Sequence, residues 1–110
     1  MPFTTELVGS TVELLVLQLL AERAMYGYEI IQIVNERTEG AFNWQEGTLY
    51  PVLHRLAGRG LLTTEWQCGA TGRQRKYYTL SPQGVAYAKV KAAEWQTFSK
   101  SVNAVLCTPA

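Results

Sequence analysis

Apolar residues recur three and four positions apart in the first third of the chain, which is the spacing of one face of an α-helix. The pattern predicts a first helix over residues 10–23, with Ser10 and Glu13 at capping-box spacing at its start. A break at residues 24–27 separates it from a second helix over residues 28–38. The apolar positions are Val12, Leu15, Val16, Leu19 and Leu20 in the first helix and Ile30, Ile31 and Val34 in the second.

The middle of the chain predicts a third helix followed by a β-hairpin. The helix spans residues 46–59. Pro51 lacks an N–H and its ring crowds the carbonyl of an earlier residue, so we expect a bent first turn but no break. Residues 61–67 and 73–80 are rich in β-formers and predict two strands, joined by a flexible tip at residues 68–72. The buried stripe of the third helix is predicted to be Leu49, Val52, Leu53 and Leu56.

A long helix over residues 82–106 is the last predicted element. Ser81 supplies an N-cap oxygen, and Pro82 suits the first helical position. The helix would extend about 37 Å at 1.5 Å per residue, and its apolar side chains have close to heptad spacing along one side. Because little of the same chain is left to cover that side, we expect a second copy to pack on it. The alternative is a helix folded back along its own core.

Together these elements predict a mainly α fold with a small β-hairpin wing. This is the architecture of a winged helix-turn-helix, here over residues 1–80, followed by a C-terminal dimerisation helix over residues 81–110.

The formal net charge of +1 is unevenly distributed along the chain. Residues 1–53 carry two arginines and seven glutamates, whereas residues 54–76 carry five cations and one glutamate. Strand alternation places Arg73 and Arg75 on one face of the hairpin and Lys76 on the other. Positive charge is thus concentrated on the third helix and the hairpin, the elements that face nucleic acid in a winged helix-turn-helix. Taken alone, the cluster could also be a solvated basic face.

Several classes of protein are excluded by what the chain lacks. No apolar run reaches about eighteen residues, so no membrane-spanning helix is expected, and the N-terminus lacks the cationic start of a signal peptide. We therefore expect a cytoplasmic protein with no membrane partner. Cys68 and Cys107 are predicted to be free thiols, and with His54 they are too few for a zinc site. With no aspartate, one histidine and no nucleophile motif, the chain is predicted not to be an enzyme and to need no metal or cofactor.

Two motifs make the chain resemble a known family. Gly-Thr-Leu-Tyr-Pro at residues 47–51 and Gly-Arg-Gln-Arg-Lys-Tyr-Tyr at residues 72–78 are specific in combination, and the similarity covers about residues 10–90. The chain resembles the PadR-like transcriptional regulators. The resemblance implies a dimeric repressor, and many such proteins sense small phenolic, aromatic or drug-like compounds. Because only one helix follows the hairpin, the chain is similar to the short subgroup, in which the final helices of two subunits cross.

The predicted partner is double-stranded DNA, with the third helix in the major groove and the hairpin on the backbone or in the minor groove. Hydroxyl groups near the start of the helix can reach phosphates or base edges, and Arg55 can pair with a guanine. For Tyr50 the alternative is a half-buried ring beneath the hairpin, and Trp66 is predicted to be core. A two-fold dimer would read an inverted repeat with half-sites about 34 Å apart. The predicted DNA-binding residues are Gly47, Thr48, Tyr50, His54, Arg55, Arg73, Arg75 and Lys76.

The last helix carries the predicted effector site. Trp95 falls where a ligand-stacking tryptophan can sit in the short PadR-like subgroup. Two copies of Trp95 across a dimer axis would hold a planar aromatic or phenolic effector, with Phe98, Val102 and Leu15 nearby. The alternative is that Trp95 fills the dimer core. The leading prediction is a ligand-responsive repressor; the second hypothesis is a winged-helix protein-interaction module, against which the hairpin cations argue.

Overall fold

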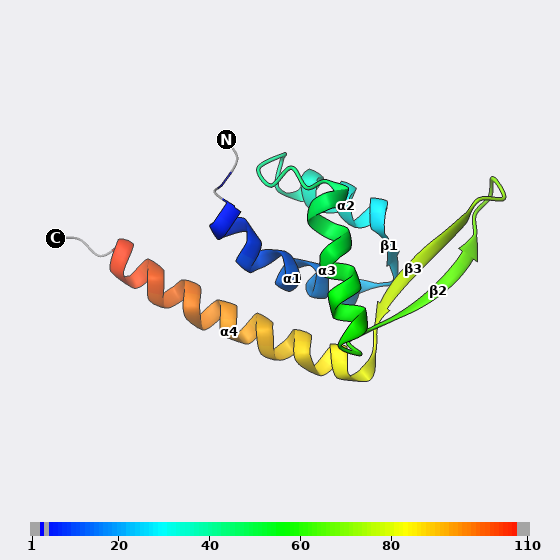
Figure 1. The fold of residues 1–110 in the computed structure, drawn as a ribbon. Helices are drawn as coiled ribbons and strands as arrows, with labels where there is room; N and C mark the ends of the chain where they lie inside the picture. Colours follow the sequence, from blue (N-terminus) through cyan, green and yellow to red (C-terminus); the bar gives the residue numbers. More distant parts are fainter. Residues whose placement is uncertain (1–2, 4, 108–110) are drawn as a thin grey trace.

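Four helices and a three-stranded antiparallel sheet make up the fold in the computed structural model, which describes residue 3 and residues 5–107 (Figure 1). The elements are α1 (Thr5–Glu22), β1 (Met25–Tyr26), α2 (Gly27–Arg37), α3 (Glu46–Gly58), β2 (Leu62–Cys68), β3 (Gln74–Leu80) and α4 (Pro82–Leu106). Helices α1, α2 and α3 form the body, the β2–β3 hairpin projects from one side, and α4 runs out on the other (Figure 1). The predicted fold class, a winged helix-turn-helix followed by a long helix, is confirmed.

The core lies where α1, α2 and α3 pack together beneath the sheet. Leu17, Ile30, Leu49, Leu53 and Leu56 are fully buried there. The apolar stripe predicted for the third helix is therefore confirmed. Burying each such side chain contributes about 1.5–3 kcal/mol, so this stripe holds α3 firmly against α1 and α2.

The predicted break between the first two helices contains a strand, β1, which corrects that part of the prediction. The strand order is β1-β3-β2. Met25 pairs with Tyr78, and Tyr26 pairs with Tyr77, both in antiparallel register. A two-residue strand has no hydrophobic period of its own, so only its pairing partner reveals it. Strand β1 joins the start of α2 to the base of the hairpin.

Helix α1 begins at Thr5, so the prediction of an N-cap at Ser10 is wrong. Ser10 and Glu13 both lie inside the helix. The Glu13 carboxylate instead accepts a hydrogen bond from the Tyr87 hydroxyl at 3.1 Å and pairs with the Arg59 guanidinium at 3.3 Å. That guanidinium also lies over the Tyr87 ring, 5.0 Å from its centroid. Glu13 therefore connects α1 to the end of α3 and to α4.

Helix α3 passes through Pro51 without a break, as predicted. Its C-cap is Arg59, and the next residue, Gly60, has a φ of 76°. This is the left-handed conformation that glycine adopts at little cost, so the predicted role of Gly60 is confirmed. The turn directs the chain straight into the hairpin.

The first turns of α4 are anchored to the body. The Ser81 hydroxyl oxygen accepts a hydrogen bond from the Gly84 N–H at 3.0 Å, which confirms the predicted N-cap, and it donates to the Gly60 carbonyl at 2.6 Å. The Gln18 amide of α1 donates to the Ala88 carbonyl at 3.0 Å. These contacts fix the direction in which α4 leaves the core.

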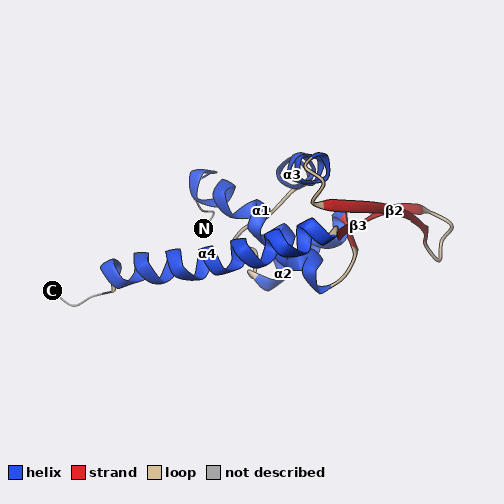
Figure 2. Cartoon of the chain, turned by 90° about the horizontal axis from the view of Figure 1, so that it is seen from below, coloured by secondary structure: helices blue, strands red, loops and turns tan. Residues whose placement is uncertain are grey.

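The C-terminal half of α4 extends beyond the body of the protein (Figure 2). Ala88 is its last fully buried side chain among the described residues. Apolar side chains further along the helix are exposed, up to 79% for Val105. Within the described part of the chain, no helix has the length and apolarity that crossing a membrane would require.

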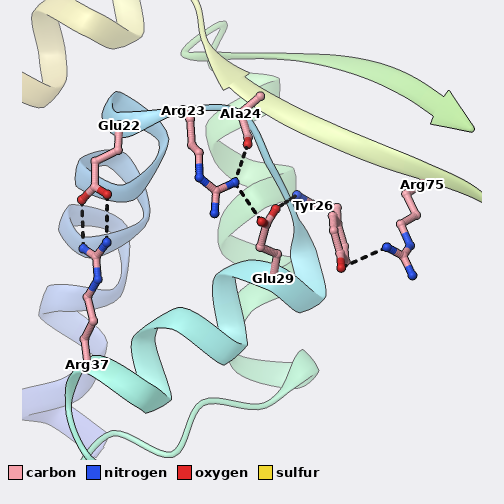
Figure 3. Close-up of polar contacts among 7 residues, drawn as sticks. All are labelled: Glu22, Arg23, Ala24, Tyr26, Glu29, Arg37 and Arg75. Carbon is pink, nitrogen blue, oxygen red and sulfur yellow. Dashed lines mark hydrogen bonds and ion pairs between the residues drawn. The ribbon is translucent and has the colours of Figure 1, made fainter. Parts of the chain in front are cut away.

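An exposed ion pair ties α1 to α2. Both terminal guanidinium nitrogens of Arg37, Nη1 and Nη2, donate to the Glu22 carboxylate at 2.9 Å (Figure 3). These hydrogen bonds hold the pKa of Glu22 below its usual value of 4.5. The ion pair therefore stabilises the fold fully at pH values above the usual pKa of Glu22. This stabilisation is lost as the pH falls through the lowered pKa.

We therefore expect the thermal stabilities of the wild-type protein and a Glu22→Gln variant to converge in acid and to separate slightly at neutral pH. Melting temperatures measured across the acid range check this. Glu65→Gln, which removes an exposed charge from β2, is the control. A gap between wild type and Glu22→Gln that persists in strong acid would contradict the assignment.

Candidate nucleic-acid interface

A groove of about 570 Å³ lies between the hairpin and the starts of α2 and α3. It combines aromatic side chains with three cations and one carboxylate. Its lining residues are Tyr26, Gly27, Tyr28, Glu46, Tyr50, Trp66, Arg73, Gln74, Arg75, Lys76 and Tyr78. Strand β1 pairs only with Tyr77 and Tyr78 of β3. Beyond these two residues, the edge of β3 is not covered by β1, and this edge borders the groove.

The two faces of the hairpin carry different residues, as the predicted alternation requires. Lys76 and Trp66 are direct cross-strand partners and therefore share a face. Tyr78, two residues from Lys76, is on the same face and is buried. Arg75 and Tyr77 occupy the opposite face, where Tyr77 meets Tyr26 edge to face at 5.4 Å between ring centroids. The hairpin thus presents Lys76 and Arg75 on different sides.

Tyr26 holds Arg75 in place. The Arg75 guanidinium donates a hydrogen bond to the Tyr26 hydroxyl at 3.0 Å and lies 4.5 Å from the centre of its ring (Figure 3). Arg75 is consequently half-buried, whereas Arg73 and Lys76 are exposed. The sequence predicts the cation but contains no sign of this partner, because the two residues are far apart in the chain.

Tyr50 lies at the meeting point of α2 and α3. A side chain on Gly27 would overlap the Tyr50 phenol, so the absence of a Cβ there allows the ring to lie against the start of α2. Burial first, and the Glu46 carboxylate second, raise the pKa of the Tyr50 hydroxyl. Tyr50 still has 41% of its surface exposed, so it is partly packed against α2 and partly accessible. Its contact with DNA stays a prediction.

The remaining predicted DNA-binding residues lie on α3. Gly47 and Thr48 are in its first turn, and His54 and Arg55 follow further along; Gly47, His54 and Arg55 are exposed, and Thr48 is half-buried. None of these four lines the groove. The structure therefore brings Tyr50 and the three hairpin cations together, and places the other four along the helix beside them.

Trp66 corrects a prediction, because it is 62% exposed and not part of the core. Only Leu62 of β2 is buried, and the strand then runs beyond the helices (Figure 1). Trp66 shares a face with Leu62, but nothing in the described chain covers that face so far out. Trp66, Tyr28 and Tyr26 are among the groove residues that sequence reasoning missed. The even spacing between Leu62 and Trp66 predicts that both side chains lie on the same face of β2. It does not predict that Trp66 is exposed.

The predicted effector residues lie on or near α4. Trp95 is 43% exposed, and its ring centroid is 6.1 Å from that of Phe98. Trp95 and Val102 follow Ala88 at intervals of one heptad, so they continue the side of α4 that packs on the body. Leu15 is half-buried against the core. The structure places Trp95, Phe98 and Val102 on one helix and Leu15 in the adjoining body.

A helix-turn-helix with a cationic hairpin beside its second helix defines the winged-helix class of regulators. The chain belongs to the transcriptional regulator PadR-like family, whose model matches residues 16–90. It is 36% identical over 81 residues to a transcriptional regulator of Mycobacterium tuberculosis, covering 74% of this chain and 72% of that protein.

Solved structures agree with this assignment. A transcriptional regulator from Clostridium thermocellum superposes with a TM-score of 0.81 at 31% identity, covering 92% of this chain and 95% of that chain. A PadR-like transcriptional regulator from Bacillus cereus has a TM-score of 0.85 at 24% identity, covering 96% and 100% of the two chains, and so shares the fold.

Proposed function

We propose that the protein is a dimeric, ligand-responsive repressor that binds an inverted-repeat operator through α3 and the hairpin. The observation that carries the proposal is the groove in which Arg73, Arg75 and Lys76 stand beside the first turns of α3. When α3 lies in the major groove, the adjacent phosphate backbone of the DNA lies beside the hairpin, and its negative charge requires cations there. Membership of a family of transcriptional regulators supports the same reading.

The exposed side of α3 supplies the base contacts in this proposal. Thr48 near its start can donate to a phosphate or a base edge, and the helix dipole favours an anion at that end. Arg55, about two turns further on, can form the bidentate pair with guanine that discriminates bases by about 1–3 kcal/mol. The fully buried stripe on the other side of α3 keeps these side chains in register.

Labelled duplexes test the DNA-binding part. The full chain is titrated, at several salt concentrations, with the upstream region of its own gene and with a scrambled duplex of the same composition. We expect tighter binding to the former and a steep loss of affinity with salt for both. Equal affinity for the two duplexes would remove sequence-specific recognition from the proposal.

Dimerisation through α4 is proposed from its exposed apolar side. Trp95 and Val102 continue the side of the helix that packs on the body, yet 43% and 38% of their surfaces remain exposed. An apolar helical side with heptad spacing is buried when a second copy of the same helix crosses it. Closed two-fold pairing also gives the two copies of α3 that an inverted repeat requires.

A glutamate within this side is expected to separate the subunits. Val102→Glu would place an uncompensated charge in an apolar interface, which costs several kcal/mol. We expect sedimentation equilibrium to give a dimer for the wild-type protein and a monomer for the variant. Gln96→Glu, which adds the same charge on another side of α4, should stay dimeric. A monomeric wild-type protein would contradict the proposed dimer. Dissociation of both variants would show that the added negative charge separates the subunits wherever it lies on α4.

Effector binding is proposed between the two copies of Trp95. Phe98 and Val102 provide apolar walls beside the indole ring, as a planar aromatic compound requires. Such a ligand changes operator affinity only if it prefers a dimer geometry that DNA does not. Quenching of tryptophan fluorescence by planar aromatic compounds, compared with a Trp95→Ala variant, tests this site; equal quenching in both would dismiss it.

A further inference from the structure

Three exposed aromatic side chains surround the groove. Trp66 of β2, Tyr28 of α2 and Tyr50 of α3 have 62%, 56% and 41% of their surfaces exposed. They come from three elements, so the hydrophobic pattern of any one element does not explain why they lie together. Exposed apolar surface concentrated in one place on a soluble protein marks an interaction site.

The positive and the negative charges beside these rings lie on opposite walls of the groove. Lys76 is the cross-strand partner of Trp66, and its ammonium lies 5.6 Å from the centre of the Tyr78 ring. Arg73 directly precedes β3, so strand alternation does not fix its face, and it lines the same groove as Lys76. The opposite wall, at the start of α3, carries the Glu46 carboxylate. Within the groove, an anionic group is therefore attracted to the hairpin cations and repelled by the Glu46 carboxylate.

We infer that this groove holds one sugar–phosphate strand of duplex DNA, with its phosphates on Lys76 and Arg73 and its deoxyribose rings against Trp66 and Tyr28. The inference rests on the proposed DNA-binding function and adds two aromatic contacts to it. A DNA strand alternates anionic phosphates with uncharged sugars, and the groove places cations beside exposed aromatic rings, with Lys76 directly across from Trp66. An acidic peptide has no such apolar element beside each charge and would leave the Trp66 ring exposed.

An aromatic contact has a different signature from a cationic one. Each cation that neutralises a phosphate releases counterions, so its removal lowers the dependence of affinity on salt. Packing a sugar against Trp66 releases no counterion. Trp66→Ala is therefore expected to weaken binding without changing the salt dependence, and Lys76→Ala to reduce the slope by about one.

Tryptophan fluorescence reports the contact directly. Trp44 is only 2% exposed, and Trp95 lies on α4 outside the lining of the groove, so DNA in the groove contacts neither of them. Titration of the full chain with a random-sequence duplex is expected to change the emission, and the change should disappear in Trp66→Phe. Polyglutamate of similar charge should leave the emission of the wild-type protein unchanged. The same emission change with polyglutamate would make the groove a general polyanion site and overturn the inference.

Affinity for the same duplex completes the test. We expect Trp66→Ala to bind about fivefold more weakly, at the lower end of aromatic stacking on nucleic acid. Gln67→Ala, on the other face of β2, should bind as the wild-type protein does. Salt-dependent binding that is equally strong in Trp66→Ala, with no emission change, would overturn the inference and leave the proposed function standing. An absence of duplex binding in every protein would remove both.

Discussion

Replacing Arg73 and Lys76 together by alanine is expected to lower the affinity for duplex DNA roughly 30- to 100-fold at about 0.1 M salt, and to reduce the salt slope by about two. Both side chains are exposed and line the groove beside α3. Arg75 is left in place because its guanidinium is held by Tyr26. Fluorescence anisotropy of a labelled duplex at several salt concentrations measures the affinity and the slope.

The matched control removes the same charge elsewhere. Lys89 and Lys100 are exposed on α4, away from the groove, and their double alanine variant has the same net charge as the hairpin variant. It should keep the wild-type slope and nearly all of the affinity. Equal losses in the two variants would show that net charge, and not the position of the cations, governs binding.

Gly84→Ala is expected to reduce the free energy of unfolding by about 2–3 kcal/mol, within the range of overpacked cores. A Cβ at Gly84 would overlap the backbone carbonyl of Leu61, whereas it would only come into van der Waals contact with the Leu80 side chain. A backbone atom cannot rotate away as a side chain can, so the start of α4 must shift from the base of the hairpin. Urea denaturation at one fixed protein concentration measures the change.

Gly58→Ala is the control for this effect. Gly58 is the last residue of α3, and within the described chain a Cβ there would meet no atom beyond its chain neighbours and the adjoining backbone of α3. Alanine loses less conformational entropy than glycine when it becomes part of a helix. The free energy of unfolding of this variant should therefore rise by up to about 1 kcal/mol. If Gly84→Ala is as stable as the wild-type protein, the close approach of α4 to Leu61 does not constrain the fold.

The sequence predicted most of the local features of the candidate interface. Tyr50 and the hairpin cations belong to two short motifs, and their side chains meet in one groove as a winged helix-turn-helix requires. The capping residues of the last helix and the left-handed Gly60 were also correct. Each of these depends on a few neighbouring residues, whose chemistry is the same in any tertiary setting.

Features that depend on distant partners were missed. Strand β1 forms because Met25 and Tyr26 meet the base of β3, some fifty residues along the chain. Tyr26 then holds Arg75, which sequence treats only as a free cation. Trp66 was placed in the core because its type favours burial, and only the length of the projecting hairpin shows that no element covers it.

The amino-acid sequence alone determined the helices, the hairpin, their order and the concentration of positive charge on the third helix and the wing. Periodicity, turn residues and charge are local properties, so one-dimensional patterns carry them. Tertiary structure decided which faces are covered, which aromatic rings gather beside the cations and where α4 leaves the body. These outcomes depend on the packing of elements distant in the sequence, and packing depends on shape in three dimensions.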